Sequence, residues 1–133
     1  MPASNYLQAK IADHTLGKTS WTMPTNVYIA LCTAEVADTD TGTTITEASY
    51  TSYARVQTSG SDWNAYTSDE SSNANSIDFP ACTGSSSTAT HFAILDASTD
   101  GNLLLFDALD ASLAISTGIT PSFEADTLTV TVT

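Results

Sequence analysis

The feature that most constrains the fold is a hairpin signal in the last third of the chain. Two apolar runs, at residues 91–95 and 103–106, are joined by a segment that contains Asp100-Gly101. An Asp-Gly pair between apolar runs is typical of a tight β-turn, because both residues tolerate the positive φ that such turns need. The sequence therefore predicts two antiparallel strands that are connected through this turn.

Further short strands are predicted on both sides of this hairpin. Apolar residues with a period of two, bounded by polar residues or proline, occur at 27–32, 53–57, 77–79, 113–115 and 127–132. The first of these segments is apolar at every position, so we expect it to be buried on both faces. The last alternates Leu128, Val130 and Val132 with threonines, which predicts one face on the core and one toward water or a partner.

These strands indicate the fold class. Several short strands separated by polar loops, such as 35–47 and 59–76, are typical of a mainly β protein, either a two-sheet sandwich or a small jelly roll. The expected hydrophobic core consists of Val27, Ile29, Leu31, Phe92, Ile94, Leu104, Phe106, Leu128, Val130 and Val132.

One short N-terminal helix is predicted over residues 6–16. Asn5 is a suitable N-cap with Gln8 three residues later, and Gly17 supplies the stop. A helix of this length is marginal alone in water, so it has to dock on its own sheet or on a neighbouring subunit. We therefore divide the chain, a single domain overall, into a helix and arm at 1–24 and a β-sandwich at 25–133.

Charge excludes several classes of function. The chain has 133 residues with 15 acidic side chains against three lysines and arginines, for a net charge of −12. Nucleic-acid binding and attraction to anionic membranes both depend on basic residues, so neither partner is expected. The N-terminus has no signal-peptide pattern, and no apolar run approaches the ~20 residues of a membrane span. The expected place of synthesis is therefore a cytoplasm.

Catalytic and metal-binding patterns are not predicted. The two histidines, His14 and His91, do not accompany a G-x-S-x-G elbow, and there is no phosphate loop or dinucleotide fingerprint. Residues 38–42 resemble the start of a calcium loop, but the twelfth position is Ser49 rather than glutamate, which favours an acidic turn. Cys32 and Cys82 are expected to be small buried side chains. We expect no enzyme activity, no cofactor and no metal.

Large and charged side chains in two segments are the candidates for protein contacts. The helix and arm contain two of the three cations together with aromatic and methionine side chains, and the polar loop at 59–76 contains two more aromatics. Such side chains are enriched at interfaces. The predicted contact residues are Tyr6, Lys10, Lys18, Trp21, Met23, Trp63 and Tyr66.

Four stretches together resemble a family of small tailed-phage virion proteins. They lie at 5–34, 52–56 (SYARV), 79–105 and 121–132. Family members share a helix, a strand similar to VYIALCTA, a Y-A-R segment, a hairpin that begins with F-P-A, and a threonine-rich last strand. The resemblance covers most of the chain and its motifs are structural, so it implies no catalytic residues. Members include capsid cement proteins and proteins labelled as tail fibre proteins.

The resemblance implies a structural role in the virion. Capsid decoration is the first expectation, with the major capsid protein and copies of this chain as partners, a trimer first and a dimer next. The chain would then lie on the capsid surface after synthesis in the host cytoplasm. A compact chain without fibre repeats favours this location over a tail fibre, baseplate or receptor-binding component. A third alternative is a carbohydrate-binding sandwich in which Trp63 and Tyr66 stack on sugar.

Overall fold

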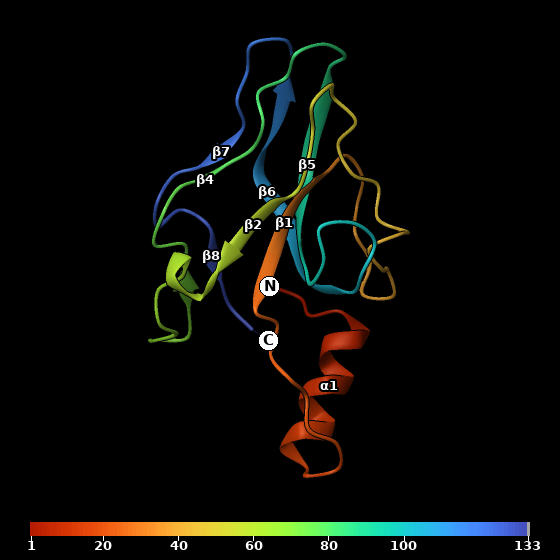
Figure 1. Ribbon diagram of the computed structural model, residues 1–133, viewed down its shortest axis with the longest axis vertical. Helices are drawn as coiled ribbons and strands as arrows, with labels where there is room; N and C mark the ends of the chain where they lie inside the picture. Colours follow the sequence, from red (N-terminus) through yellow and green to blue (C-terminus); the bar gives the residue numbers. More distant parts are fainter. Residues whose placement is uncertain (133) are drawn as a thin grey trace.

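The computed structural model describes residues 1–132 and consists of one helix followed by a β-sandwich (Figure 1). The helix is α1 (Asn5–Thr15), and a single 3-10 turn, η1, covers Gly60–Asp62. The strands are β1 (Asn26–Cys32), β2 (Val56–Ser59), β3 (Ser71–Ser72), β4 (Ile77–Asp78), β5 (Ser87–Leu95), β6 (Leu103–Ile115), β7 (Ser122–Phe123) and β8 (Thr129–Val130).

The main sheet is antiparallel and has the strand order β2-β1-β5-β6. Its central hairpin, β5–β6, confirms the turn prediction, with φ of 52° at Asp100 and 75° at Gly101. Residues 113–115 do not form a separate strand, as predicted, but are the end of β6. After a register shift near His91, Leu113 pairs with Ala89, so the two strands stay together along the sandwich.

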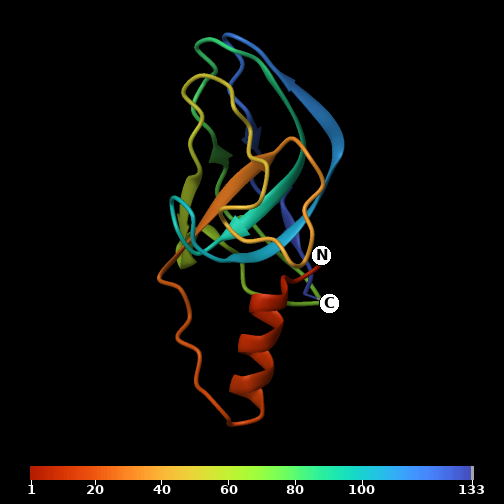
Figure 2. The same cartoon turned by 90° about the vertical axis from the view of Figure 1, so that its right-hand side faces the viewer.

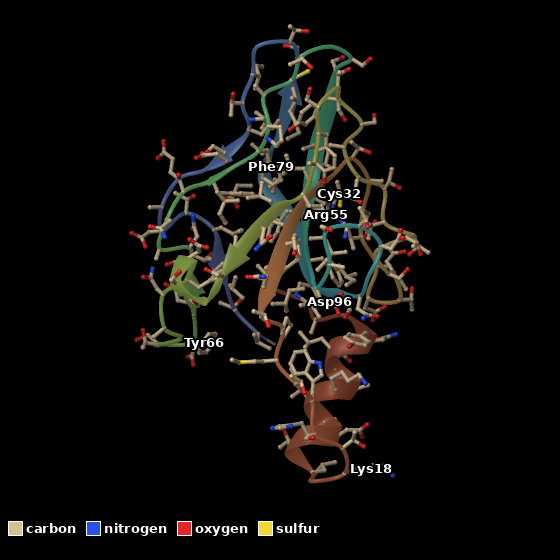
Figure 3. All side chains as sticks on the ribbon, in the orientation of Figure 1. Lys18, Cys32, Arg55, Tyr66, Phe79 and Asp96 are labelled. Carbon is tan, nitrogen blue, oxygen red and sulfur yellow. The ribbon has the colours of Figure 1, made fainter. Side chains whose placement is uncertain are left out.

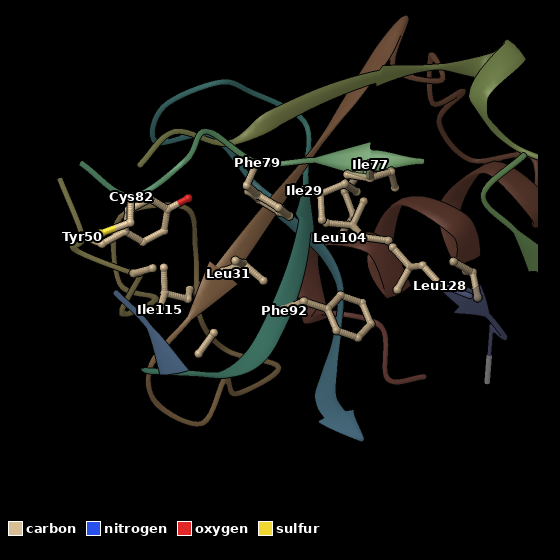
Figure 4. Close-up of a cluster of buried hydrophobic side chains, with 14 of the residues drawn as sticks. Ile29, Leu31, Tyr50, Ile77, Phe79, Cys82, Phe92, Leu104, Ile115 and Leu128 are labelled. Atoms are coloured by element: carbon tan, nitrogen blue, oxygen red, sulfur yellow. The ribbon is translucent and has the colours of Figure 1, made fainter. Parts of the chain in front are cut away.

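Two apolar layers hold this sheet in place. On one face, Ile29, Leu31 and Phe92 pack against side chains in and beside the short pairs β4–β7 and β3–β8, including Phe79 just after β4 and Leu128 just before β8 (Figure 4). On the other face the core is completed from the loop after β1, by Val36 and Ile45, and consists of Ala30, Cys32, Val36, Ile45, Ala93, Leu95, Leu103 and Phe106. Neighbouring residues of β1 and β5 alternate between these layers, so both strands are buried on both faces, as predicted for β1.

Two predicted strands are shorter than the sequence pattern indicates. Strand β2 begins at Val56 rather than residue 53, because the chain turns just before it: the N–H of Tyr53 donates to the carbonyl of Tyr50 at 3.1 Å, and Ser52 has a φ of 82°. Strand β8 covers only Thr129–Val130, and the expected core residue Val132 is 47% exposed beyond its end. Val27 is only half-buried, at the edge of the core.

The helix begins one residue earlier than predicted and has a different cap. The hydroxyl of Ser4, not the side chain of Asn5, accepts a hydrogen bond from the N–H of Leu7 at 3.1 Å. The Ser4 hydroxyl also donates to the carbonyl of Leu103 in the sheet, which Asn5 cannot reach from the helix surface. Gly17 ends the helix with φ of 73°, as expected of a C-terminal glycine.

The helix lies outside the sandwich rather than on its face. Figures 1 and 2 show α1 extending from the end of the sandwich where the two chain termini meet. Leu7, in its first turn, is the one helical residue that is buried. Within residues 1–132, no helix combines the length and apolar character that a membrane crossing requires.

Candidate functional site

The candidate contact surface begins next to the first residues of the chain, which are hydrogen-bonded to the edge strand β6 of the main sheet. Ala3 pairs with Leu105 of β6, and the N–H of Ser4 donates to the carbonyl of Leu104 at 2.8 Å. Leu7 then enters the main core. Residues 1–7 therefore complete the sandwich, while the rest of α1 leaves it.

The arm after the helix returns along it toward the sandwich (Figure 2). At the turn, the N–H groups of Lys18 and Thr19 both donate to the carbonyl of Asp13. Further along, the N–H of Trp21 donates to Nδ1 of His14 at 3.1 Å. Helix and arm thus form one hairpin-like unit, which we call the helix–arm unit (residues 5–25).

One side of the helix–arm unit is apolar and open. Ile11 and Leu16 line a hollow of about 490 Å³ together with Ala12, Thr15 and Val132. The side chain of Leu16 is 82% exposed, and Met23 on the arm is 79% exposed. Exposed apolar side chains that gather around a hollow mark a contact surface more than a scattered exposed leucine does. We call the residues that line this hollow the apolar face.

A second apolar cavity joins the arm to the sandwich. Its volume is about 350 Å³, and Trp21, Pro24 and Trp63 line it together with core residues such as Leu7. The indole N–H of Trp63 donates to the hydroxyl of Thr58 at 3.0 Å, so this ring is fixed in the sandwich wall. The cavity places Trp21 of the arm opposite a rigid part of the sandwich.

The structure brings most of the seven predicted contact residues together, but not all of them. The ammonium group of Lys10 lies 5.4 Å from the centre of the Tyr6 ring, on the same side of α1. Lys18 lies at the far tip of the helix (Figure 3), and Tyr66 lies in a separate loop, where its hydroxyl donates to the carbonyl of Asp69. Trp63 approaches Trp21 across the cavity, whereas Tyr66 is separated from the helix–arm unit.

A buried ionic cluster was missed by the sequence reasoning. The Arg55 side chain, only 3% exposed, forms an ion pair with Glu47 at 2.9 Å. Glu47 also accepts a hydrogen bond from the hydroxyl of Tyr53 at 2.7 Å, and that hydroxyl accepts one from the N–H of Leu31. Burial, followed by the bond to Glu47, raises the pKa of Tyr53. The available signal was an arginine within a predicted strand of a chain that has only three cations.

The acidic side chain Asp40 of the predicted turn has a structural role, because it binds groups within the same loop. The carboxylate of Asp40 accepts hydrogen bonds from the N–H of Ala37 and the hydroxyl of Thr44, both at 2.8 Å. In the part of the chain that the structure describes, histidine, cysteine and acidic side chains form no group of three that could hold a metal ion. Cys32 and Cys82 are both buried free thiols, as predicted.

The fold and the surface define a class of protein: a small β-sandwich whose N-terminal helix projects with apolar side chains exposed. The sequence matches the family model described as Podophage GP4 fiber I protein gp80 over residues 2–131. The chain belongs to this family and is a phage virion structural protein, which confirms the resemblance seen in the sequence. A comparison with curated proteins found no match.

Proposed function

We propose that this chain is a fibre subunit of the phage particle and that it binds a neighbouring virion protein through the apolar face of its helix–arm unit. The observation that carries the proposal is the exposure of Leu16, at 82%, on a helix that leaves the sandwich. Burying such side chains against an apolar groove of a partner removes apolar surface from water, which favours association. The location in the fibre rests on the description of the family.

The charge of the chain supports a protein partner with a neutral or basic surface. With a net charge of −12, copies of the chain repel one another at long range. Contacts through a neutral, apolar surface avoid this repulsion, and many weak contacts add up when several copies bind one particle. We also expect the chain to self-associate, with a trimer favoured over a dimer. Light scattering of the purified chain tests this prediction.

Capsid decoration is the second candidate, with the major capsid protein as the partner. A specific observation favours it: the strands between residues 26 and 130 form one β-sandwich, and residues 1–132 contain no shaft, heptad or collagen-like repeat. A domain of this kind suits repeated binding across a shell. Electron microscopy of particles with a gold label on the chain separates fibre from shell directly.

The structure also determines how the contact surface should be tested. Deleting residues 1–24 would remove Ala3, Ser4 and Leu7, which belong to the sheet edge and the core. Loss of binding by such a shortened chain would therefore not separate docking from folding. Point substitutions on the exposed side chains avoid this difficulty.

The experiment compares two matched double variants in particle assembly. Ile11→Gln with Leu16→Gln alters two exposed side chains of the apolar face, and Leu113→Gln with Ile119→Gln alters two exposed apolar side chains outside the helix–arm unit. Both variants should unfold at the same temperature as the wild type. We expect the first to be at least tenfold depleted from purified particles and the second to be incorporated normally, as measured by quantitative mass spectrometry. Normal incorporation of the first variant would refute the proposed docking surface.

A further inference from the structure

A polar cleft lies between the arm and the sandwich, on another side of the helix–arm unit. Its volume is about 330 Å³, and it is formed by the first turn of α1, the arm, the start of β1 and the residue after β5. Three half-buried aromatic residues line it together with an amide and a carboxylate: Tyr6, Trp21, Tyr28, Asn26 and Asp96. Figure 3 labels Asp96 where the sandwich meets the helix.

Two of the three aromatic residues of this cleft have a polar group without a protein partner in the described chain, whereas the hydroxyl of Tyr28 donates to the side-chain oxygen of Gln57. Within residues 1–132, the indole N–H of Trp21 and the hydroxyl of Tyr6 make no hydrogen bond to protein. The corresponding groups elsewhere are engaged: the indole of Trp63 donates to Thr58, and the hydroxyl of Tyr50 donates to the carbonyl of Pro80. The cleft therefore combines aromatic rings with hydrogen-bond donors that have no protein partner.

Two further polar side chains line the cleft, the carboxylate of Asp96 and the amide of Asn26. Both carboxylate oxygens of Asp96 accept hydrogen bonds from Asn102, from its backbone N–H at 2.7 Å and its side-chain amide at 2.9 Å. These bonds orient the carboxylate but leave lone pairs on each oxygen, because an ionised carboxylate has about four acceptor sites. The side-chain amide of Asn26 has no partner among the described residues and can both donate and accept.

We propose that this cleft binds a neutral saccharide. A sugar ring has an apolar C–H face that packs on an aromatic ring and hydroxyl groups that both donate and accept, which matches Trp21 beside Asp96 and Asn26. Neighbouring hydroxyls of the sugar donate to Asp96 and accept from the Trp21 indole. An acidic sugar is disfavoured, because Asp96 lies in the cleft and the chain carries a net charge of −12.

This site differs from the one expected from sequence and is separate from the docking surface. The sequence prediction placed sugar stacking on Trp63 and Tyr66, but both have their polar group bonded within the protein. Tyr6, which lines the cleft, and Thr15, which lines the apolar face, are nine residues apart on α1, or about two and a half turns. They lie on opposite sides of the helix, so a partner on the apolar face leaves the cleft open.

The test measures binding of saccharides to the intact chain. An array of neutral oligosaccharides, their sialic- and uronic-acid counterparts and intact bacterial surface polysaccharides identifies the class, and isothermal titration calorimetry measures affinity for the wild type and every variant. We expect neutral glycans to bind, and the array separates free oligosaccharides from cell-surface polymers as their source. Trp21→Ala should weaken binding at least tenfold, and Asn26→Ala and Tyr6→Phe several-fold each.

Matched variants keep the result interpretable if Trp21→Ala is destabilised. Tyr6→Phe removes one oxygen atom and Asn26→Ala removes one half-buried amide that has no protein partner within residues 1–132, so both should fold normally. Trp63→Phe and Tyr66→Ala serve as aromatic controls outside the cleft and should bind like the wild type. The proposal is wrong if neutral glycans do not bind at millimolar concentration, if only acidic glycans bind, or if affinity is unchanged in Tyr6→Phe and Asn26→Ala. Particle incorporation of these variants is expected to be normal, so the outcome is independent of the docking surface.

Discussion

Arg55 is bound through two of its nitrogens by the carboxylate of Glu47, at 3.0 Å from Nε and 2.9 Å from one terminal nitrogen. The other donors of the guanidinium reach the carbonyls of Ala97, Asp100 and Gly42, at 2.8, 2.9 and 3.0 Å. All five N–H donors of the side chain are therefore used. This cluster ties the segment before β2 to the loop after β1 and to the β5–β6 turn.

Loss of this cluster should destabilise the fold strongly. Arg55→Ala leaves the carboxylate of Glu47 without its partner, and breaking a buried ion pair costs about 3–5 kcal/mol of unfolding free energy. Arg55→Lys keeps the charge but not the planar fork, so it should fall between the alanine variant and the wild type. Lys18→Ala makes the same change in charge at an exposed position and should stay within about 0.5 kcal/mol. Urea unfolding measures all three, and equal stability of Arg55→Ala and Lys18→Ala would contradict the prediction.

Gly42 should not tolerate a side chain. A methyl group on its Cα would overlap the backbone carbonyl of Asp100, which cannot move without disturbing the β5–β6 turn. Gly42→Ala should therefore lower stability by about 1–3 kcal/mol or more. Gly60→Ala is the control, because nothing lies within 4 Å of the added methyl group there. Thermal unfolding that ranks Gly60→Ala below Gly42→Ala would show that the contact is wrongly placed.

The end of the last strand can be located by a pair of identical substitutions. Val130 is 8% exposed and packs in the main core, whereas Val132 is 47% exposed. Val130→Ala should lower the free energy of unfolding by about 1–3 kcal/mol, because it removes buried methyl groups and leaves a cavity. Val132→Ala should change it by less than about 0.5 kcal/mol. Similar losses at both positions, measured in urea, would mean that the strand continues to Val132.

Alkaline pH should destabilise the protein through Cys32. Burial, with a further effect of Glu47, raises the pKa of this thiol from 9.0 to about 12. The folded state keeps the proton while the unfolded chain loses it, so the stabilisation is complete below pH 9 and is lost as pH rises toward 12. The slope is at most about 1.4 kcal/mol per pH unit for one group. The raised pKa of Tyr53 acts in the same direction.

Urea unfolding between pH 7 and 11 tests this contribution. Cys32→Ala should reduce the decline in stability above pH 9. Val36→Ala, in the same apolar layer, should lower stability at every pH without changing the slope. If the slope is the same in Cys32→Ala and the wild type, the thiol does not contribute to it.

The local elements of this protein were open to prediction from sequence. The β5–β6 turn follows from Asp100-Gly101, because the positive φ at both residues is a property of the residues themselves. Strand β1 was predicted to be buried on both faces because its apolar residues are continuous. The length of β6 was not predicted, since most of residues 107–114 are exposed and follow no regular alternation of apolar and polar residues, so that pairing with β5 makes them a strand.

The sequence by itself determined the mainly β sandwich class and the short N-terminal helix, because period and turn residues are encoded locally, whereas the projection of the helix from the sandwich is seen only in the structure. Tertiary structure alone decided that Ser4 caps the helix, because its partner Leu103 lies 99 residues away. It likewise placed Trp21 beside Asp96 and Trp63, and Glu47 beside Arg55. These contacts join segments that are far apart in the sequence and come together only when both faces of the sheet are covered. The periodicity of the sequence therefore does not predict them.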